Sequence, residues 1–271
     1  MRYLPMLALL SALIIGCEQA ETDPNSSTFS ESTADSTVPA RLDIPLVDRD
    51  STRYYTYRIS YPGLIRTDSL IRATTRDFAD EHKQKFLQLF EGGDPPQTAS
   101  YPWELRLEFT VQDSSSSFVS VLGSGYVFSG GAHGNNFFRT INVDRRTGKL
   151  LQLSDLLADS TALVPIRNYV KDKLTEKLVK KSQQQDNPQA SGTSEEQIRQ
   201  WVREGTKPHL DNYQYFWLSE PANGHTTGLT FLFPPYQVAP YAEGNQQVFV
   251  PASVFAGTLS PVYREWFGIS Y

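Results

Sequence analysis

The chain has 271 residues, of which 39% are hydrophobic and 20% charged, and its formal net charge is −5, so it is long enough to bury a core in one or two domains. The acidic balance, without a Lys/Arg cluster interleaved with aromatic residues, argues against nucleic acid as a partner. Cys17 is the only cysteine, which excludes an internal disulfide, thiol catalysis and a cysteine-based zinc site.

The first 17 residues resemble the leader of a bacterial lipoprotein. Arg2 precedes a short apolar run over residues 4–15, which ends at Gly16 and Cys17; a run of this length is typical of a signal peptide and too short for a spanning helix. We expect residues 1–16 to be a lipoprotein signal peptide and Cys17 to be acylated, which would anchor the chain to a membrane. The alternative is an ordinary secretory signal.

Residues 17–41 follow the leader and are rich in Ser, Thr, Asp and Glu, with almost no large apolar side chain. Such a segment buries too little surface to offset the entropy lost on ordering. We therefore expect a disordered tether between the acylated cysteine and the folded part.

From about residue 42 the chain shows strand and helix periods. Large and polar side chains alternate over 54–62, as in a half-buried strand, and apolar residues recur at helical spacing over 66–90. Gly148 is expected at a positive φ in a hairpin turn, and Ser154 and Asp155 are expected to cap a short helix. Further strands are predicted over 103–113, 118–130, 136–143 and 150–153.

The second half predicts two amphipathic helices, over 160–181 and over 194–205. The latter opens with the capping-box residues Ser194 and Gln197 and closes at Gly205. The aromatic tail over 262–271 is expected to dock on the body. Three more strands are predicted over 213–219, 228–233 and 247–250, with a short helix over 251–255.

This order of elements predicts the fold class. Helices are inserted between strand meanders and do not alternate strictly with strands. We therefore expect an α+β fold, with antiparallel sheet meanders packed against a few amphipathic helices.

The histidines do not form a metal-binding pattern. No two of them share the i, i+4 spacing of a zinc-binding helix and no HxH pair occurs, so neither a metal nor a cofactor is predicted. The histidines are His82, His133, His209 and His225.

Catalytic constellations are equally weak in the sequence. A triad of Ser129, His133 and Asp144 can be drawn, but no G-x-S-x-G elbow presents a nucleophile. The glycine-rich stretch over 123–131 is not followed by the Lys and Ser/Thr of a phosphate-binding loop. The many carboxylates are expected to be solvated surface groups, and no catalytic residue is predicted.

Two short stretches are candidates for a binding surface. In "SGGAHGNN", Gly130 and Gly131 permit a tight bend, and His133 and Asn135 follow it. In "FPPYQVAPYAEG", Tyr236 and Tyr241 lie in a loop stiffened by proline, which needs little further ordering when a ligand binds. The alternative is a purely structural role, as a hairpin corner and as the closed end of a sheet.

These two stretches, in this order, resemble the family of domains of unknown function numbered 3298 (DUF3298), which would occupy residues 126–271. The preceding "YRISYPGLI", "FADEHKQKFLQLF" and "LRLEFTVQ" resemble its usual N-terminal companion, DUF4163, which would occupy residues 42–125. The resemblance spans roughly residues 45–260 and implies an extracytoplasmic α+β module. Some proteins of this type are the outer domains of anti-sigma factors that bind lysozyme, and others are attached to peptidoglycan deacetylases.

The resemblance guides the functional expectation. The sequence shows no spanning helix, anti-sigma segment or appended catalytic domain, so only binding is carried over. We expect a lipid-anchored protein of the bacterial cell envelope, with a non-catalytic binding module for a wall-related protein resembling lysozyme, or for a glycan. The alternatives are a hydrolase of peptidoglycan or glycan with its cleft near His133, and a structural envelope lipoprotein.

Overall fold

The computed structural model describes residues 45–91, 102–184, 194–222 and 225–269, all of which belong to one compact unit. The predicted signal peptide over 1–16, Cys17 and the tether over 17–41 lie outside the described residues. In the described part of the chain, no helix is long and apolar enough to cross a membrane.

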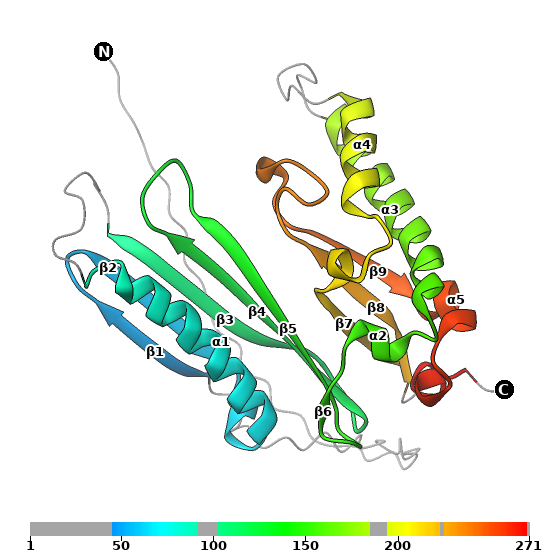
Figure 1. Cartoon of the computed structure of the whole chain (residues 1–271), viewed down its shortest axis with the longest axis horizontal. Coiled ribbons are helices and arrows are strands. Elements are labelled where there is room, and N and C mark those ends of the chain that lie inside the picture. The colour runs from blue at the N-terminus through cyan, green and yellow to red at the C-terminus, as the bar shows by residue number, and fades with distance from the viewer. Residues whose placement is uncertain (1–44, 92–101, 185–193, 223–224, 270–271) are drawn as a thin grey trace, which may run out of the picture. The chain divides into compact units, whose positions relative to one another are not determined.

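A six-stranded sheet in the order β1-β2-β3-β4-β5-β6 forms the first half of the fold (Figure 1). All neighbouring strands are antiparallel except β2 and β3, which are parallel because the helix α1 lies between them in the chain and returns it to the same end of the sheet. The elements are β1 (Leu46–Ser51), β2 (Tyr55–Tyr61), a 3₁₀ turn η2 (Gly63–Arg66), α1 (Ser69–Gln88), β3 (Trp103–Ser114), β4 (Phe118–Phe128), β5 (Asn135–Asp144) and β6 (Lys149–Leu150).

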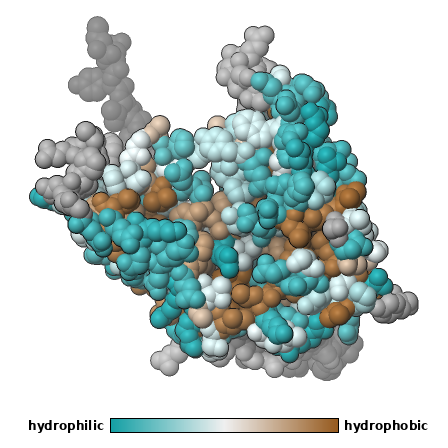
Figure 2. Space-filling model, in the orientation of Figure 1, coloured by the Kyte–Doolittle hydropathy of each residue, from teal (hydrophilic) through white to brown (hydrophobic). Residues whose placement is uncertain are grey.

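The helix α1 covers one face of this sheet. Asp68 caps its first turn by accepting a hydrogen bond from the backbone N–H of Ile71 at 2.9 Å. Its buried side, which includes Ile71 and Phe86, packs on apolar residues of β2 to β5 such as Leu107 and Ile141. Its solvent side is hydrophilic (Figure 2).

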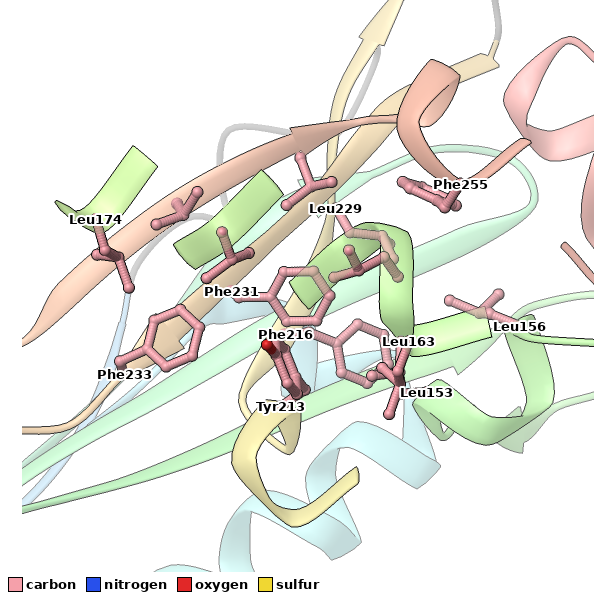
Figure 3. Packing of buried hydrophobic residues seen from close by; sticks show 14 of the residues in the cluster. Leu153, Leu156, Leu163, Leu174, Tyr213, Phe216, Leu229, Phe231, Phe233 and Phe255 are labelled. Carbon is pink, nitrogen blue, oxygen red and sulfur yellow. The ribbon is translucent and has the colours of Figure 1, made fainter. Parts of the chain in front are cut away.

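A three-stranded antiparallel sheet in the order β7-β8-β9 forms the second half, with α3 packed on it (Figure 1). Figure 3 shows its core, in which the ring of Tyr213 meets those of Phe231 and Phe233 edge-on. The elements are α2 (Leu153–Leu156), η3 (Ser160–Ala162), α3 (Leu163–Gln183), α4 (Glu195–Gly205), η4 (Leu210–Tyr213), β7 (Phe216–Ala222), β8 (His225–Phe233), η5 (Tyr241–Glu243), β9 (Gln246–Pro251), α5 (Ala252–Phe255), η6 (Ala256–Thr258) and η7 (Pro261–Phe267).

The predicted α+β class is confirmed, as are the hairpin turn with Gly148 at φ 64°, the capping box of α4 and the docking of the tail through Trp266 and Phe267. Predictions at two places are wrong. The strand predicted over 213–219 begins only at Phe216. Tyr213 lies in η4, where its buried hydroxyl donates to the carbonyl of Thr206 at 2.9 Å. The strand predicted over 150–153 ends at Leu150, and Leu153 begins α2. The cap of α2 is Gln152 and not Ser154, while Asp155 does take part in the capping box.

The edge strand β1 and the parallel β2–β3 pair were not predicted. Most residues of β1 are exposed, so the strand shows none of the alternation that marks a half-buried strand. The expected division between residues 125 and 126 falls inside β4.

The pKa of Tyr61 provides a test of the first core. Tyr61 is 7% exposed, and burial raises its pKa from 10.0 to about 12. Above pH 10 the unfolded chain ionises this tyrosine while the folded chain holds its proton. The free energy of unfolding should therefore fall from about pH 10 to about pH 12.

Chemical denaturation of the wild type and of Tyr61→Phe across this range measures the contribution of Tyr61. The variant should lose less stability per pH unit, and the difference between the two proteins should be confined to alkaline pH. Equal slopes would contradict the assignment.

Candidate functional site

The predicted hairpin corner connects β4 and β5. Gly130 and Gly131 have φ of 90° and 97°, a backbone conformation that side-chain-bearing residues rarely adopt. The bend ends at Asn135, the first residue of β5, which pairs with Val127 and is exposed. The corner is thus a hairpin turn that presents His133 at its tip.

His133 does not stand alone at this turn. Its ring stacks on Tyr241, with centroids 4.2 Å apart and an interplanar angle of 21°. Its Nδ1 lies 3.0 Å from the carbonyl oxygen of Gly134, and the Tyr241 hydroxyl donates to the same oxygen at 3.0 Å. Because a carbonyl only accepts, Nδ1 is the donor in this contact.

Tyr236 completes what we name the aromatic corner, defined as His133, Tyr236 and Tyr241. Its ring centroid lies 5.5 Å from that of Tyr241, and it is 56% exposed. Its φ of 70° is the only positive φ of a non-glycine residue in the described part of the chain. A conformation of this kind costs about 1–3 kcal/mol, so the surrounding structure must hold it.

The support for Tyr236 comes from α4. The indole of Trp201 donates to the carbonyl of Tyr236 at 2.9 Å. The side chain of Gln237 donates to the carbonyls of Gly205 and Asn212, at 3.0 and 2.9 Å. The loop that carries Tyr236 is therefore fixed on the end of a helix before any ligand arrives.

A polar groove adjoins the aromatic corner. A Cβ on Gly134 would lie 2.3 Å from the ring of Tyr126, so this ring packs directly against the hairpin. Tyr126 also lines a groove of about 410 Å³ on the six-stranded sheet, with Arg58, Arg106 and Asn136 among its other residues. Tyr126 therefore links the groove to the hairpin that carries His133.

The structure does not assemble the triad drawn from the sequence. Asp144 ends β5 and Asn135 begins it, which separates the two by roughly 30 Å at about 3.3 Å per residue. Asp144 is buried and pairs with Arg146 at 3.4 Å, while Ser129 and His133 lie at the other end of the strand. The described residues also contain no group of three or more His, Cys, Asp or Glu residues placed to hold a metal ion.

The sequence predicted Gly130, Gly131, His133, Asn135, Tyr236 and Tyr241 as binding residues, and the structure brings the two stretches that carry them together. Cys17 lies outside the described residues. The contributions of Tyr126 and Trp201 were not predicted. Tyr126 and Asn136 lie on opposite sides of the predicted turn and pair across the hairpin. This spacing could have indicated that Tyr126 lies beside the candidate site.

Comparison with known families divides the chain into two matching parts. Residues 154–253 match the family described as "Protein of unknown function (DUF3298)", and residues 49–136 match the family described as "Deacetylase PdaC". The C-terminal match agrees with the DUF3298 resemblance over these residues. The N-terminal match is to the PdaC family, and the DUF4163 resemblance stays a prediction.

Among individual proteins, the chain is similar to the peptidoglycan-N-acetylmuramic acid deacetylase PdaC of Bacillus subtilis (strain 168). The two are 22% identical over 209 residues, which is 77% of this chain and 40% of that protein. The chain thus spans two fifths of this relative.

One solved structure supports the fold. A DUF3298 family protein from Pseudomonas aeruginosa PAO1 superposes with a TM-score of 0.50 at 18% identity, covering 81% of this chain and 97% of that one. A DUF3298 family member from Bacteroides fragilis NCTC 9343 gives a TM-score of 0.46 at 12% identity, covering 81% and 94%.

Proposed function

We propose that this chain is an envelope-associated protein that binds a cell-wall glycan through the aromatic corner and the adjoining groove, without catalysing a reaction on it. The observation that carries the proposal is the stacked pair His133–Tyr241, held by two hydrogen bonds to one carbonyl. Aromatic rings fixed beside polar side chains suit a sugar, which offers both apolar faces and hydroxyls.

The comparisons support the choice of ligand. One relative is named as a peptidoglycan deacetylase, and the N-terminal match is to a family with the same name. A protein similar to both is expected outside the cytoplasm, at the wall. Anchoring through an acylated Cys17 belongs to the same proposal.

Sedimentation with purified peptidoglycan sacculi tests the binding. We expect saturable binding by the wild type, weakened at least about 10-fold in Tyr241→Ala, because truncating an aromatic hot spot costs about 2 kcal/mol or more. Tyr241→Phe keeps the stacking but loses the hydrogen bond to Gly134 and should weaken binding about 2- to 5-fold.

The matched control is Tyr169→Ala, which removes a half-buried tyrosine from α3 and should leave binding unchanged. Equal losses in Tyr241→Ala and in the control would contradict the assignment of the site. If lysozyme binds saturably and sacculi do not bind, the partner is a basic protein and not a glycan. Binding to neither would favour the structural lipoprotein.

The hydrolase alternative is favoured by the name of the deacetylase relative alone. It is tested by mass spectrometry of sacculi incubated with the protein. Deacetylated or soluble muropeptides that are formed by the wild type and lost in His133→Ala, with binding retained, would establish an enzyme and overturn the non-catalytic proposal.

A further inference from the structure

The face of the six-stranded sheet opposite α1 is only partly covered, and we name it the outer face. Near the shared end of β4 and β5, Ser120 and Asn142 meet the second sheet at Leu218 and Phe216. Leu122 and Phe138 pack on Trp217 and Leu232 of that sheet. The rest of the outer face, towards the aromatic corner, carries the 410 Å³ groove.

Three arginines cross this face in a row. The strand register places Arg49 of β1 opposite Arg58 of β2, and Arg58 opposite Arg106 of β3. Neighbouring strands lie about 4.8 Å apart, and directly opposed side chains point to the same face. We name Arg49, Arg58 and Arg106 the arginine row.

The register continues the row with neutral side chains. Arg106 lies opposite Tyr126, and Tyr126 lies opposite Asn136. The guanidinium of Arg106 stands 4.9 Å from the centroid of the Tyr126 ring. One line across the sheet therefore carries three positive charges, then an aromatic ring, then an amide.

Like charges placed directly opposite one another destabilise a sheet, and the neighbouring acids compensate only part of this row. Glu104 pairs with Arg106 at 3.0 Å, but their side chains are 36% and 60% exposed, so solvent screens the pair. Glu108 lies one row away, opposite Ser60, and lines the same groove, where its charge offsets one of the two arginines. Among the described residues, Arg49 and Arg58 form no ion pair. The row thus keeps an excess of positive charge on a chain whose net charge is −5.

We infer that the arginine row binds the carboxylates of an acidic glycan, whose sugar ring lies against Tyr126. This inference rests on the proposed function and names the chemistry of its ligand. A planar guanidinium binds a carboxylate with two parallel hydrogen bonds. The side chains of Ser60, Ser124 and Asn136 line the same groove and supply partners for sugar hydroxyls.

The first test compares native sacculi with sacculi whose carboxyl groups have been converted to neutral amides. We expect amidation to weaken binding of the wild type by at least about 10-fold. Arg58→Gln and Arg106→Gln should each weaken binding to native sacculi by about 10-fold and leave binding to amidated sacculi unchanged. Arg58→Lys should recover only part of the loss, because an ammonium lacks the guanidinium fork.

The control is Arg76→Gln, which makes the same charge change at an exposed position of α1 and should bind native sacculi as the wild type does. A second readout is the melting temperature. Removing a charge from a row of like charges should leave the Tm of Arg58→Gln unchanged or higher. A lower Tm with unchanged binding would show a structural role for the row and overturn the inference.

The outcomes separate this inference from the proposed function. Native and amidated sacculi could bind equally well, with both interactions weakened by Tyr241→Ala. This result would support glycan binding and overturn the role of the arginines. If neither form of sacculi binds, a soluble polygalacturonate oligomer tests the row directly. Binding of this oligomer that is lost in Arg58→Gln would support carboxylate binding by the arginine row, with a ligand other than the wall. No binding of the oligomer would overturn both this inference and the proposed function. Equal or tighter binding of single-stranded DNA with the same charge would assign the surface to polyanions in general and overturn the glycan.

Discussion

Substituting Gly205 by alanine should lower the free energy of unfolding by about 3 kcal/mol, at the upper end of the usual cost of overpacking. A Cβ at this position would lie 1.9 Å from the carbonyl oxygen of Gln237 and 2.7 Å from its carbon. Both atoms belong to the backbone of the loop that presents Tyr236, so neither can move by a simple rotation of a side chain. Urea denaturation measures the loss.

Gly257→Ala is the matched control, because a Cβ there meets no heavy atom within 4 Å. It should leave the midpoint of denaturation nearly unchanged. The two variants make the same chemical change, so a similar midpoint for both would contradict the close approach of α4 to the loop.

The same substitution should disturb the aromatic corner. Trp201 on α4 donates to the carbonyl of Tyr236, and displacing the loop would lengthen this hydrogen bond. We expect the indole N–H resonance of Trp201 to shift in Gly205→Ala and to stay in place in Gly257→Ala. Binding to sacculi should weaken in the first variant alone, since pre-ordering of the loop is lost.

Asn142→Ala is the second large effect we expect, with a loss of about 2–4 kcal/mol. Asn142 is buried on β5 and joins the two sheets. Its amide donates to the carbonyl of Phe216 at 2.9 Å and accepts from the hydroxyl of Ser120 at 2.7 Å. That hydroxyl in turn accepts from the N–H of Leu218 at 3.3 Å. The substitution leaves the Phe216 carbonyl buried without this donor.

Asn135→Ala controls for the loss of an asparagine from the same strand, since Asn135 is exposed, and it should change stability by less than about 0.5 kcal/mol. A double-mutant cycle of Ser120→Ala and Asn142→Ala should show coupling of about 1 kcal/mol, because the two side chains share one network. Additive losses would show that the two groups act independently.

The helices and most strands could be predicted from the sequence because their signals are local. The capping box at Ser194 and Gln197 marks the start of α4, and alternation over 103–113 marks β3. β1 gave no such signal, because an exposed edge strand need not alternate. The parallel β2–β3 pair was missed because the direction of pairing depends on where the chain returns after α1.

Gly205 shows how a correct prediction can have a different physical reason. The sequence placed it at the end of a helix, where glycine commonly takes a left-handed conformation. The structure does end α4 at Gly205, but this residue is not among the glycines with positive φ. Glycine is needed there because the Gln237 carbonyl approaches too closely for a Cβ.

For the candidate site, the sequence by itself determined the two stretches that carry His133, Tyr236 and Tyr241, because glycine, proline and aromatic residues leave a local pattern. Only the tertiary structure decided that they meet: Tyr241 and Gly134 are 107 residues apart when their hydrogen bond forms. The arginine row is invisible in the sequence for the same reason. Arg49, Arg58 and Arg106 become neighbours only through strand register, which is set by pairing between distant segments and not by the residues beside each arginine.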